Sequence, residues 1–266
     1  MRPVFHEQQG VTLPLCQGEY YATLHDNNLG IARYSLYKIT SEQATATKVP
    51  RPAGDPWQPN QTPGIHQGSN ALYRDQPIQG RYERGHLVPV DILRYSTGSA
   101  LATFTFTNCV PQIAGFNKGQ WGKYERKIKK YAQQTCSSEG GTLFLITGIS
   151  SVSFSRTGSH PVKTIVKRVE PMRWFHNDVD VNQKIAIPNS IWTVGCCLNL
   201  DNEVVGAFGV MGHNSFEKRI LNVILMSSQT VKSVENTLRL EDPTIDLFPL
   251  GSDCYDQEKN VKLNEI

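Results

Sequence analysis

The segment Gly119–Gln134 constrains the fold more than any other part of the chain. Its apolar side chains recur every three or four residues, which is the period of an α-helix. They form one stripe, made of Trp121, Tyr124, Ile128 and Tyr131. The other faces carry a run of cations, at Lys123, Arg126, Lys127, Lys129 and Lys130. The segment is therefore predicted to be an amphipathic helix, with Trp121 and Tyr124 in the core.

Apolar alternation predicts strands before and after this helix. The segments Tyr20–His25 and Ile31–Lys38 flank a turn-like stretch and are expected to form a hairpin. Leu101–Asn108 alternates cleanly and predicts a strand, preceded by a loop or short turn over Asp91–Ser99. Three core strands and a further helix are expected at Thr142–Ile149, Ser190–Asn199, Val204–Met211 and Thr230–Arg239.

The chain is expected to form one α+β domain over residues 11–255, with terminal extensions at 1–10 and 256–266. Strands and helices mix without the regular alternation of βαβ units, and no internal repeat is visible. Residues 48–80 are rich in proline and glycine, which argues against regular structure there. The strands before that segment have too little apolar surface to form a core alone, so it is not a domain boundary.

Composition and cysteine usage bear on the compartment. The formal net charge of +3 is too small to argue by itself for a polyanionic partner. No run reaches the roughly 18 to 20 apolar residues of a membrane span, so no membrane partner is expected. Six cysteines without C-x-x-C spacing favour three disulfides, with Cys16 and Cys254 tying down the terminal regions. We therefore expect a secreted protein whose signal peptide is absent from this sequence. The alternative is a cytosolic protein with buried thiols.

The window from residue 81 to residue 125 holds the groups that phosphodiester hydrolysis requires: a base, a cation for phosphate and a metal ligand. His86 titrates in the range of a general base, and Arg84 can bind phosphate oxygens in a fork. Asn117 and Glu125 lie about two helical turns apart, so both can face one site. An amide oxygen is a hard ligand that suits Mg²⁺.

Three motifs in this window resemble those of a known family. The stretch Glu83-Arg84-Gly85-His86 is similar to the Asp-Arg-Gly-His signature of the DNA/RNA non-specific endonucleases, also called ββα-metal or His-Me finger nucleases. Phe106–Gln112 resembles the family's Ser/Thr-Asn-x-x-Pro-Gln strand, and Asn117–Trp121 with Glu125 resembles its Asn-x-Gly-x-Trp segment followed by Glu. Weaker similarity covers most of residues 15–250. The opening residues are similar to a secreted animal subgroup, the endonuclease domain-containing proteins.

The resemblance implies a fold, a cofactor and a reaction. The fold would be a central, mostly antiparallel sheet flanked by helices, and the cofactor Mg²⁺, with Mn²⁺ or Ca²⁺ as alternatives. The substrate would be DNA, RNA or both, cut to 5′-phosphate ends, while the oligomeric state is left open. By position, His86 would be the general base, Arg84 a phosphate contact, Asn117 the direct metal ligand and Glu125 a holder of water on the metal. Asn108 would shape the site beside the base.

Further residues are assigned by the resemblance or by local charge. Arg51, near Asp55-Pro56, is the candidate for the family's upstream arginine, which stabilises the transition state. Arg81, Lys118 and Lys123 are candidates for substrate binding, because cations attract phosphates without regard to sequence. Glu83 would support the residues that contact the metal and the substrate, without contacting either itself. It departs from the family, which usually has Asp at that position.

Two other interpretations remain open at this stage. The chain could be a catalytically weakened nuclease fold that binds nucleic acid or a protein partner, with Glu83 as a sign of decay. It could also be a cytosolic or mitochondrial nuclease, in which case all six cysteines would be thiols.

Overall fold

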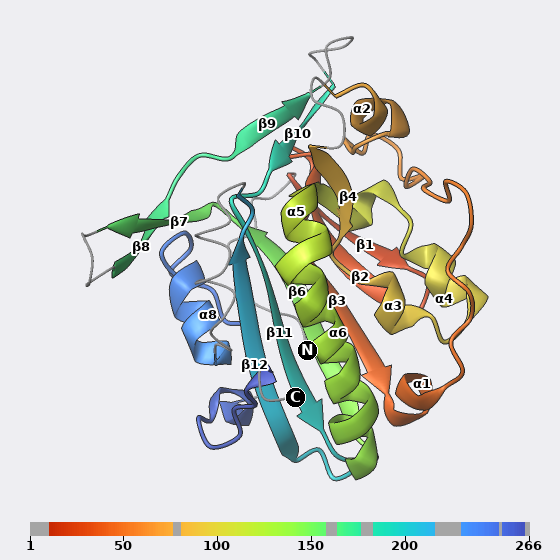
Figure 1. Ribbon diagram of the computed structural model, residues 1–266, viewed down its shortest axis with the longest axis vertical. Helices are drawn as coiled ribbons and strands as arrows, with labels where there is room; N and C mark the ends of the chain where they lie inside the picture. The colour runs from red at the N-terminus through yellow and green to blue at the C-terminus, as the bar shows by residue number, and fades with distance from the viewer. Residues whose placement is uncertain are drawn as a thin grey trace.

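The computed structural model describes residues 11–76, 81–157, 164–176, 183–215, 230–249 and 252–263. Its centre is a sheet in which each described strand runs antiparallel to its neighbours (Figure 1). The strand order is β1 (Thr12–Gln17), β2 (Tyr21–Asp26), β3 (Ile31–Thr40), β6 (Thr142–Ser150), β11 (Ser190–Leu198) and β12 (Val204–His213). This arrangement confirms the predicted α+β fold, the opening hairpin and the later core strands.

The two faces of the sheet are covered by different helices. On β6, successive side chains point to opposite faces, so Leu145 joins one core cluster and Ile146 the other. The first cluster contains the apolar stripe of α6 (Gly122–Tyr131), and the second contains that of α8 (Val231–Leu238). Because β6 is apolar along most of its length, it can be buried on both sides, and the molecule has three layers (Figure 1).

A two-stranded ribbon and a helix lie next to each other on the α6 side of the sheet. The strands β4 (Tyr82–His86) and β5 (Cys109–Ile113) pair antiparallel, with His86 opposite Cys109. The chain then becomes helical through α5 (Ala114–Phe116), a π-helical turn, α6 and a second π-helical turn that ends at Cys136. The helix predicted from the apolar stripe is therefore confirmed and is longer than expected.

The strand predicted at Leu101–Asn108 is wrong, and so is the loop predicted at Asp91–Ser99. These residues form α3 (Val90–Leu93), α4 (Thr97–Ala102) and a 3₁₀ turn, Phe106–Asn108. The reason lies in Ser96, whose hydroxyl accepts a hydrogen bond from the backbone N–H of Ser99 and starts a helix. This cap overrides the alternating pattern that follows it.

The proline- and glycine-rich segment forms little regular structure, as predicted. It follows the short helix α1 (Ser41–Thr45) and contains α2 (Asn70–Arg74), while residues 77–80 lie outside the described residues. An isolated bridge between Gln58 and Thr105 holds it against the 3₁₀ turn before β5. This long excursion is therefore attached to the segment that precedes β5.

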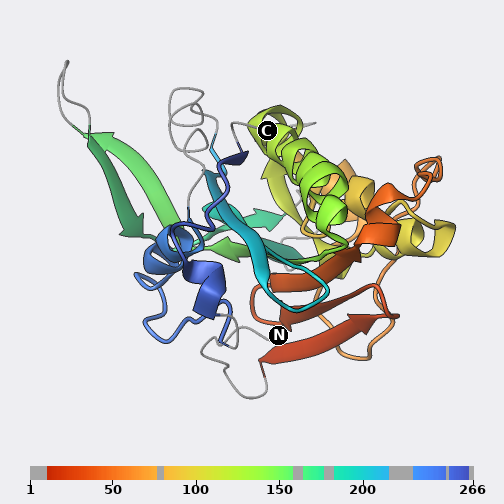
Figure 2. The same cartoon turned by 90° about the horizontal axis from the view of Figure 1, so that it is seen from below.

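Two further ribbons extend from the body. The first, β7 (Val152–Thr157) with β8 (Thr164–Val169), projects away from the sheet (Figure 2). The second, β9 (Arg173–His176) with β10 (Lys184–Ile187), packs through Phe175 against Tyr82 of β4. Short 3₁₀ turns, Ser137–Glu139 and Ser252–Tyr255, complete the described elements.

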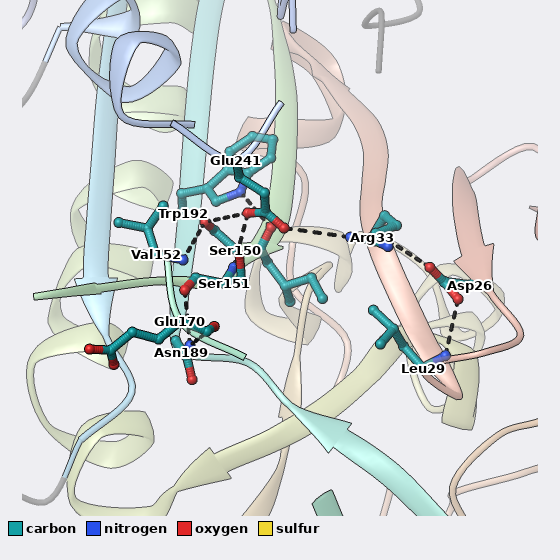
Figure 3. A network of polar contacts seen from close by, with 11 residues as sticks. Asp26, Leu29, Arg33, Ser150, Ser151, Val152, Glu170, Asn189, Trp192 and Glu241 are labelled. Atoms are coloured by element: carbon teal, nitrogen blue, oxygen red, sulfur yellow. Dashed lines mark hydrogen bonds and ion pairs between the residues drawn. The ribbon is translucent and has the colours of Figure 1, made fainter. Parts of the chain in front are cut away.

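A polar network ties the opening hairpin to the rest of the sheet (Figure 3). Arg33 on β3 lies 2.7 Å from the carboxylate of Asp26 and 3.6 Å from that of Glu241, which follows α8. Glu241 in turn accepts hydrogen bonds from the Ser150 hydroxyl at 2.8 Å and the Ser151 backbone N–H at 3.0 Å. One arginine thus connects the hairpin to the end of β6 through two carboxylates.

Two disulfides are present where three were expected. They join Cys136 to Cys197 and Cys196 to Cys254, so adjacent residues of β11 are bonded on opposite faces of the sheet. Cys16 is an exposed free thiol, and Cys109 is a buried one in β5. The predicted role of Cys254 in tying down the C-terminal region is confirmed, and the corresponding role of Cys16 is wrong. None of the described helices has the length and apolar character needed to cross a membrane.

The disulfide pattern predicts a thiol count. Unreduced protein in denaturant should show two reactive thiols, and the native protein only one, because Cys109 is buried and burial raises its pKa to about 12. A colorimetric thiol assay on native, denatured and reduced samples checks this. A count of none or of six in the denatured, unreduced sample contradicts the pairing.

Candidate functional site

A pocket of about 770 Å³ lies between β4, the start of the helical segment after β5, and the excursion over residues 48–76. Seven of the residues singled out from the sequence line it: Arg51, Glu83, Arg84, His86, Asn117, Lys118 and Glu125. Groups that are up to 74 residues apart in the chain, from residue 51 to residue 125, are therefore brought together. The ribbon β4–β5 and the helix behind it carry most of them.

The ribbon is tightly packed because of a glycine. A Cβ atom on Gly85 would lie 2.1 Å from Cδ of Gln112, whose side chain is fully buried on the neighbouring strand. Any larger residue at this position would displace the buried side chain of Gln112. Gly85 thus allows the close pairing that places Arg84 and His86 two residues apart on one face of β4.

His86, the last residue of β4, packs against two aromatic rings that also contact each other. Its ring centroid lies 4.7 Å from that of Trp57 and 5.0 Å from that of Phe104. Nε2 is buried and has no hydrogen-bond partner among the described residues. Burial and, to a smaller extent, the nearby Arg51 and Arg84 together lower the pKa of His86 from 6.5 to about 3. The imidazole is therefore neutral at physiological pH and has a nitrogen that can accept a proton.

Arg84 is oriented by side chains from the excursion. Its Nη1 donates to Oδ1 of Asp55 at 2.9 Å and also to Oδ1 of Asn70. Its guanidinium carbon lies 5.4 Å from the ring centroid of Trp57, so that ring contacts both Arg84 and His86. A guanidinium has five N–H donors in a planar fork, and the contacts found among the described residues use only Nη1. The remaining donors can bind a phosphate.

Asn108 acts from behind the pocket and does not line it. Its fully buried amide accepts a hydrogen bond from the Val88 N–H at 2.9 Å and donates to the carbonyls of Val88 at 3.1 Å and Thr103 at 2.9 Å. Its backbone carbonyl accepts from the Leu87 N–H at 2.9 Å. Three of these four bonds fix the two residues that follow His86, and the fourth attaches Asn108 to Thr103. Asn108 is accordingly a positioning residue.

Asn117 begins the π-helical turn and faces the carboxylate of Glu83. Its Nδ2 donates to Oε2 of Glu83 at 2.9 Å, which leaves the amide oxygen Oδ1 for a ligand in the pocket. The ammonium of Lys118 forms an ion pair with the other carboxylate oxygen of Glu83. The side chain of Glu83, which is one methylene longer than the family's Asp, thus reaches the helix. It orients the amide of Asn117, which was predicted from the sequence to bind the metal.

Glu125 lines the pocket from the first turn of α6. Burial, and next the carboxylate of Asp91, raise the pKa of Glu125 to about 8, while Arg126 and Arg51 oppose the shift. A cation in the pocket would favour the ionised form. The oxygen donors here, an amide and carboxylates, suit a hard divalent cation such as Mg²⁺.

No group of three or more His, Cys, Asp or Glu side chains that could enclose a metal is found among the described residues. This observation is compatible with Mg²⁺, which keeps several of its waters and often takes only one or two protein ligands. The residues present therefore fit such an ion, since the Asn117 amide oxygen could serve as a direct ligand.

Two predicted substrate contacts lie outside this pocket. Lys123 is exposed on α6, and Arg81 lies just before β4, with its guanidinium carbon 5.5 Å from the Tyr82 ring centroid. In contrast, Trp57, Asp55 and Asn70 were not predicted. Asp55 and Trp57 lie close to Arg51 in the sequence, and this could have suggested them as site residues. However, sequence spacing does not show that the excursion folds back over β4.

Comparisons with known proteins agree with this geometry. The sequence profile of the DNA/RNA non-specific endonucleases matches residues 6–238. The chain belongs to this family. The ribbon–helix arrangement of β4, β5 and α6 corresponds to the ββα unit that the resemblance implied, and the fold class is confirmed.

Two relatives illustrate the similarity. The human endonuclease domain-containing 1 protein is 24% identical over 199 residues, which cover 75% of this chain and 32% of that protein. The chain thus spans about a third of that relative's length. A chain from the crystal structure of the EndoG/EndoGI complex, which describes EndoG inhibition, superimposes with a TM-score of 0.66 at 17% identity. The superposition covers 94% of this chain and 91% of the other, and at this identity it shows a shared fold.

The environment of His86 predicts its charge state. The imidazole should stay neutral at pH 5, because burial and two adjacent arginines oppose a third positive charge and lower the pKa to about 3. The ¹⁵N chemical shifts of the ring nitrogens, assigned by comparison with His86→Ala, measure this in metal-free protein. A titration midpoint near the ordinary value of 6.5 contradicts the description of the site.

Proposed function

We propose that this protein is a divalent-metal-dependent endonuclease that hydrolyses phosphodiester bonds of DNA, RNA or both and leaves 5′-phosphate ends. The observation that carries the proposal is the neutral, buried Nε2 of His86, which lacks a partner among the described residues and lies in a pocket with Arg84 and Asn117. Family membership supports the reaction class. The pocket supplies the groups that this reaction requires.

His86 acts as the general base. Its Nε2 takes a proton from a water molecule, and the oxygen of that water forms a bond to phosphorus as the bond from phosphorus to the 3′ oxygen breaks. The 3′ oxygen leaves with a proton from solvent, and the phosphate stays on the 5′ side. The rings of Trp57 and Phe104 hold the imidazole in place. The bonds of Asn108 to the chain after His86 fix its backbone.

Cations of the chain stabilise the phosphate as negative charge develops. Arg84 binds phosphate oxygens through the donors that Asp55 and Asn70 do not use. Arg51, whose guanidinium carbon lies 5.3 Å from the Phe104 ring centroid, supplies a second positive charge from the excursion. Because both arginines also lower the pKa of His86, they keep the base unprotonated before substrate binds.

Asn117 and Glu125 would hold the divalent cation. The amide Oδ1 of Asn117 would be the direct ligand, and Glu125 would accept hydrogen bonds from the water molecules around the ion. When bound, such an ion would offset charge on the phosphate and on the departing oxygen. Mg²⁺ is the proposed ion, and Mn²⁺ or Ca²⁺ would find the same oxygen donors. Glu83 holds the Asn117 amide in the required orientation.

We place the protein in an oxidising compartment and propose that it is secreted. The two disulfides persist where glutathione does not reduce them, as in extracellular proteins. They connect the end of the long helical segment and the C-terminal region to β11.

A second candidate function is nucleic-acid binding without efficient cleavage. Arg84 is already paired with Asp55, and Lys118 is paired with Glu83, so the cations of the pocket are partly neutralised in the free protein. Such pairing reduces the ability of these cations to stabilise the transition state. It has a smaller effect on the general attraction between a basic surface and phosphates.

Plasmid cleavage with and without EDTA separates the two candidates. Wild-type protein with Mg²⁺ should nick and linearise the plasmid, and EDTA should stop it. His86→Ala should lose activity by roughly 10²- to 10⁴-fold, the range for a general base. Thermal unfolding of both proteins controls for folding. Equal cutting by His86→Ala overturns the mechanism, whereas plasmid binding without cutting by the wild type with Mg²⁺ or Mn²⁺ supports the second candidate.

A further inference from the structure

A second pocket, of about 220 Å³, adjoins the first on the far side of Tyr82. Tyr82 lines both pockets, so the two pockets meet at this residue. The second pocket is lined by Arg81, Arg173 and His176 together with the rings of Tyr82, Trp174 and Phe175. Its lining also includes Gln76 and Ile187, and no carboxylate is among the described residues that line it. A basic and aromatic hollow therefore continues from the proposed site.

The β9–β10 ribbon positions the aromatic groups of this pocket. Phe175 points inward, 5.3 Å from the ring centroid of Tyr82 and 5.0 Å from that of Tyr73. Alternation along the strand turns Trp174 to the outer face, where 42% of its surface is exposed. Phe175 thus anchors the ribbon to the wall of the first pocket and fixes the position of the exposed tryptophan.

A cation contacts the ring of Trp174: Lys184, on the paired strand, places its ammonium 4.9 Å from the ring centroid. Two further cations, Arg173 and Arg81, line the pocket; Arg173 is exposed on the Phe175 face of β9, and Arg81 lies just before β4. An exposed indole flanked by cations is the arrangement that nucleic-acid-binding surfaces use, because bases stack on the ring while the cations attract the phosphates.

We propose that this pocket is a subsite for the nucleic-acid strand that flanks the bond to be cut. A base stacks on Trp174 at the rim of the pocket, and Arg173 and Arg81, which line the pocket, bind a neighbouring phosphate. The proposal rests on the proposed function, since the strand reaches the subsite by passing Tyr82 from the scissile phosphate. Stacking and phosphate contacts do not discriminate between bases, so the subsite increases affinity and not sequence preference.

Binding is measured without cleavage in the His86→Ala background, in EDTA, by the fluorescence anisotropy of a labelled single strand of about 12 nucleotides. Adding Trp174→Ala should weaken binding about fivefold or more, whereas Trp174→Phe should retain most of the affinity. Arg173→Gln should weaken binding and make it less dependent on salt. Arg168→Gln, an exposed arginine of β8 that does not line the pocket, is the matched control and should bind as the parent does.

Cleavage by otherwise wild-type protein tests the position of the subsite. Trp174→Ala should raise KM for the long strand by a similar factor and leave kcat/KM for a dinucleotide unchanged, because a dinucleotide does not reach past Tyr82. Unchanged binding and unchanged KM in Trp174→Ala overturn the subsite. An acidic peptide that competes with the strand at equal affinity also overturns it.

The two proposals fail in different ways. If the wild type cuts in a His86-dependent manner and Trp174→Ala behaves like the wild type, only the subsite is wrong. If the wild type binds the strand through Trp174 but does not cut it, only the endonuclease function is wrong. If the protein neither binds nor cuts nucleic acid, both are wrong.

Discussion

The pairing of β4 with β5 is the constraint on which the rest of the site depends. It is tight because Gly85 has no side chain and the amide of Gln112 packs over it. The amide of Asn108 continues the same attachment past the end of β4 by binding Val88. As a result, His86 is held at a fixed place on the ribbon, and the helical segment that follows β5 brings Asn117 and Glu125 to the same pocket.

The electrostatics of the pocket follow from this geometry. Burial and, after it, two nearby arginines keep the imidazole of His86 neutral, so the base is unprotonated in the free protein. Two carboxylates partly neutralise the cations of the pocket. Asp55 forms an ion pair with Arg84, and Glu83 forms one with Lys118. The extra methylene of Glu83 relative to the family's Asp is accommodated, because the carboxylate reaches both Asn117 and Lys118. Glu83 is therefore part of the polar network of the site.

The sequence predicts the parts of this structure that have a strong local signal. The stripe of α6 and the apolar run of β6 could be recognised from their periods, and the motifs at residues 83–86 and 117–125 predicted residues that share the pocket. Long-range contacts left no such signal: Trp57 reaches His86 only because the excursion folds back across β4. A serine cap at Ser96 overrode the alternation after it, and the cysteines could not be paired by spacing, so Cys16 was assigned a bond that it does not form.

The central claim is that the ribbon and the helix build one metal-assisted hydrolytic site around His86. Anomalous diffraction from His86→Ala crystals soaked in Mn²⁺ tests it most directly, because that variant keeps the oxygen donors and removes the base. The account predicts an anomalous peak within coordination distance of Asn117 Oδ1, with its outer waters facing Glu125. A pocket without a peak at millimolar Mn²⁺, or a peak bound elsewhere in the molecule, would contradict it.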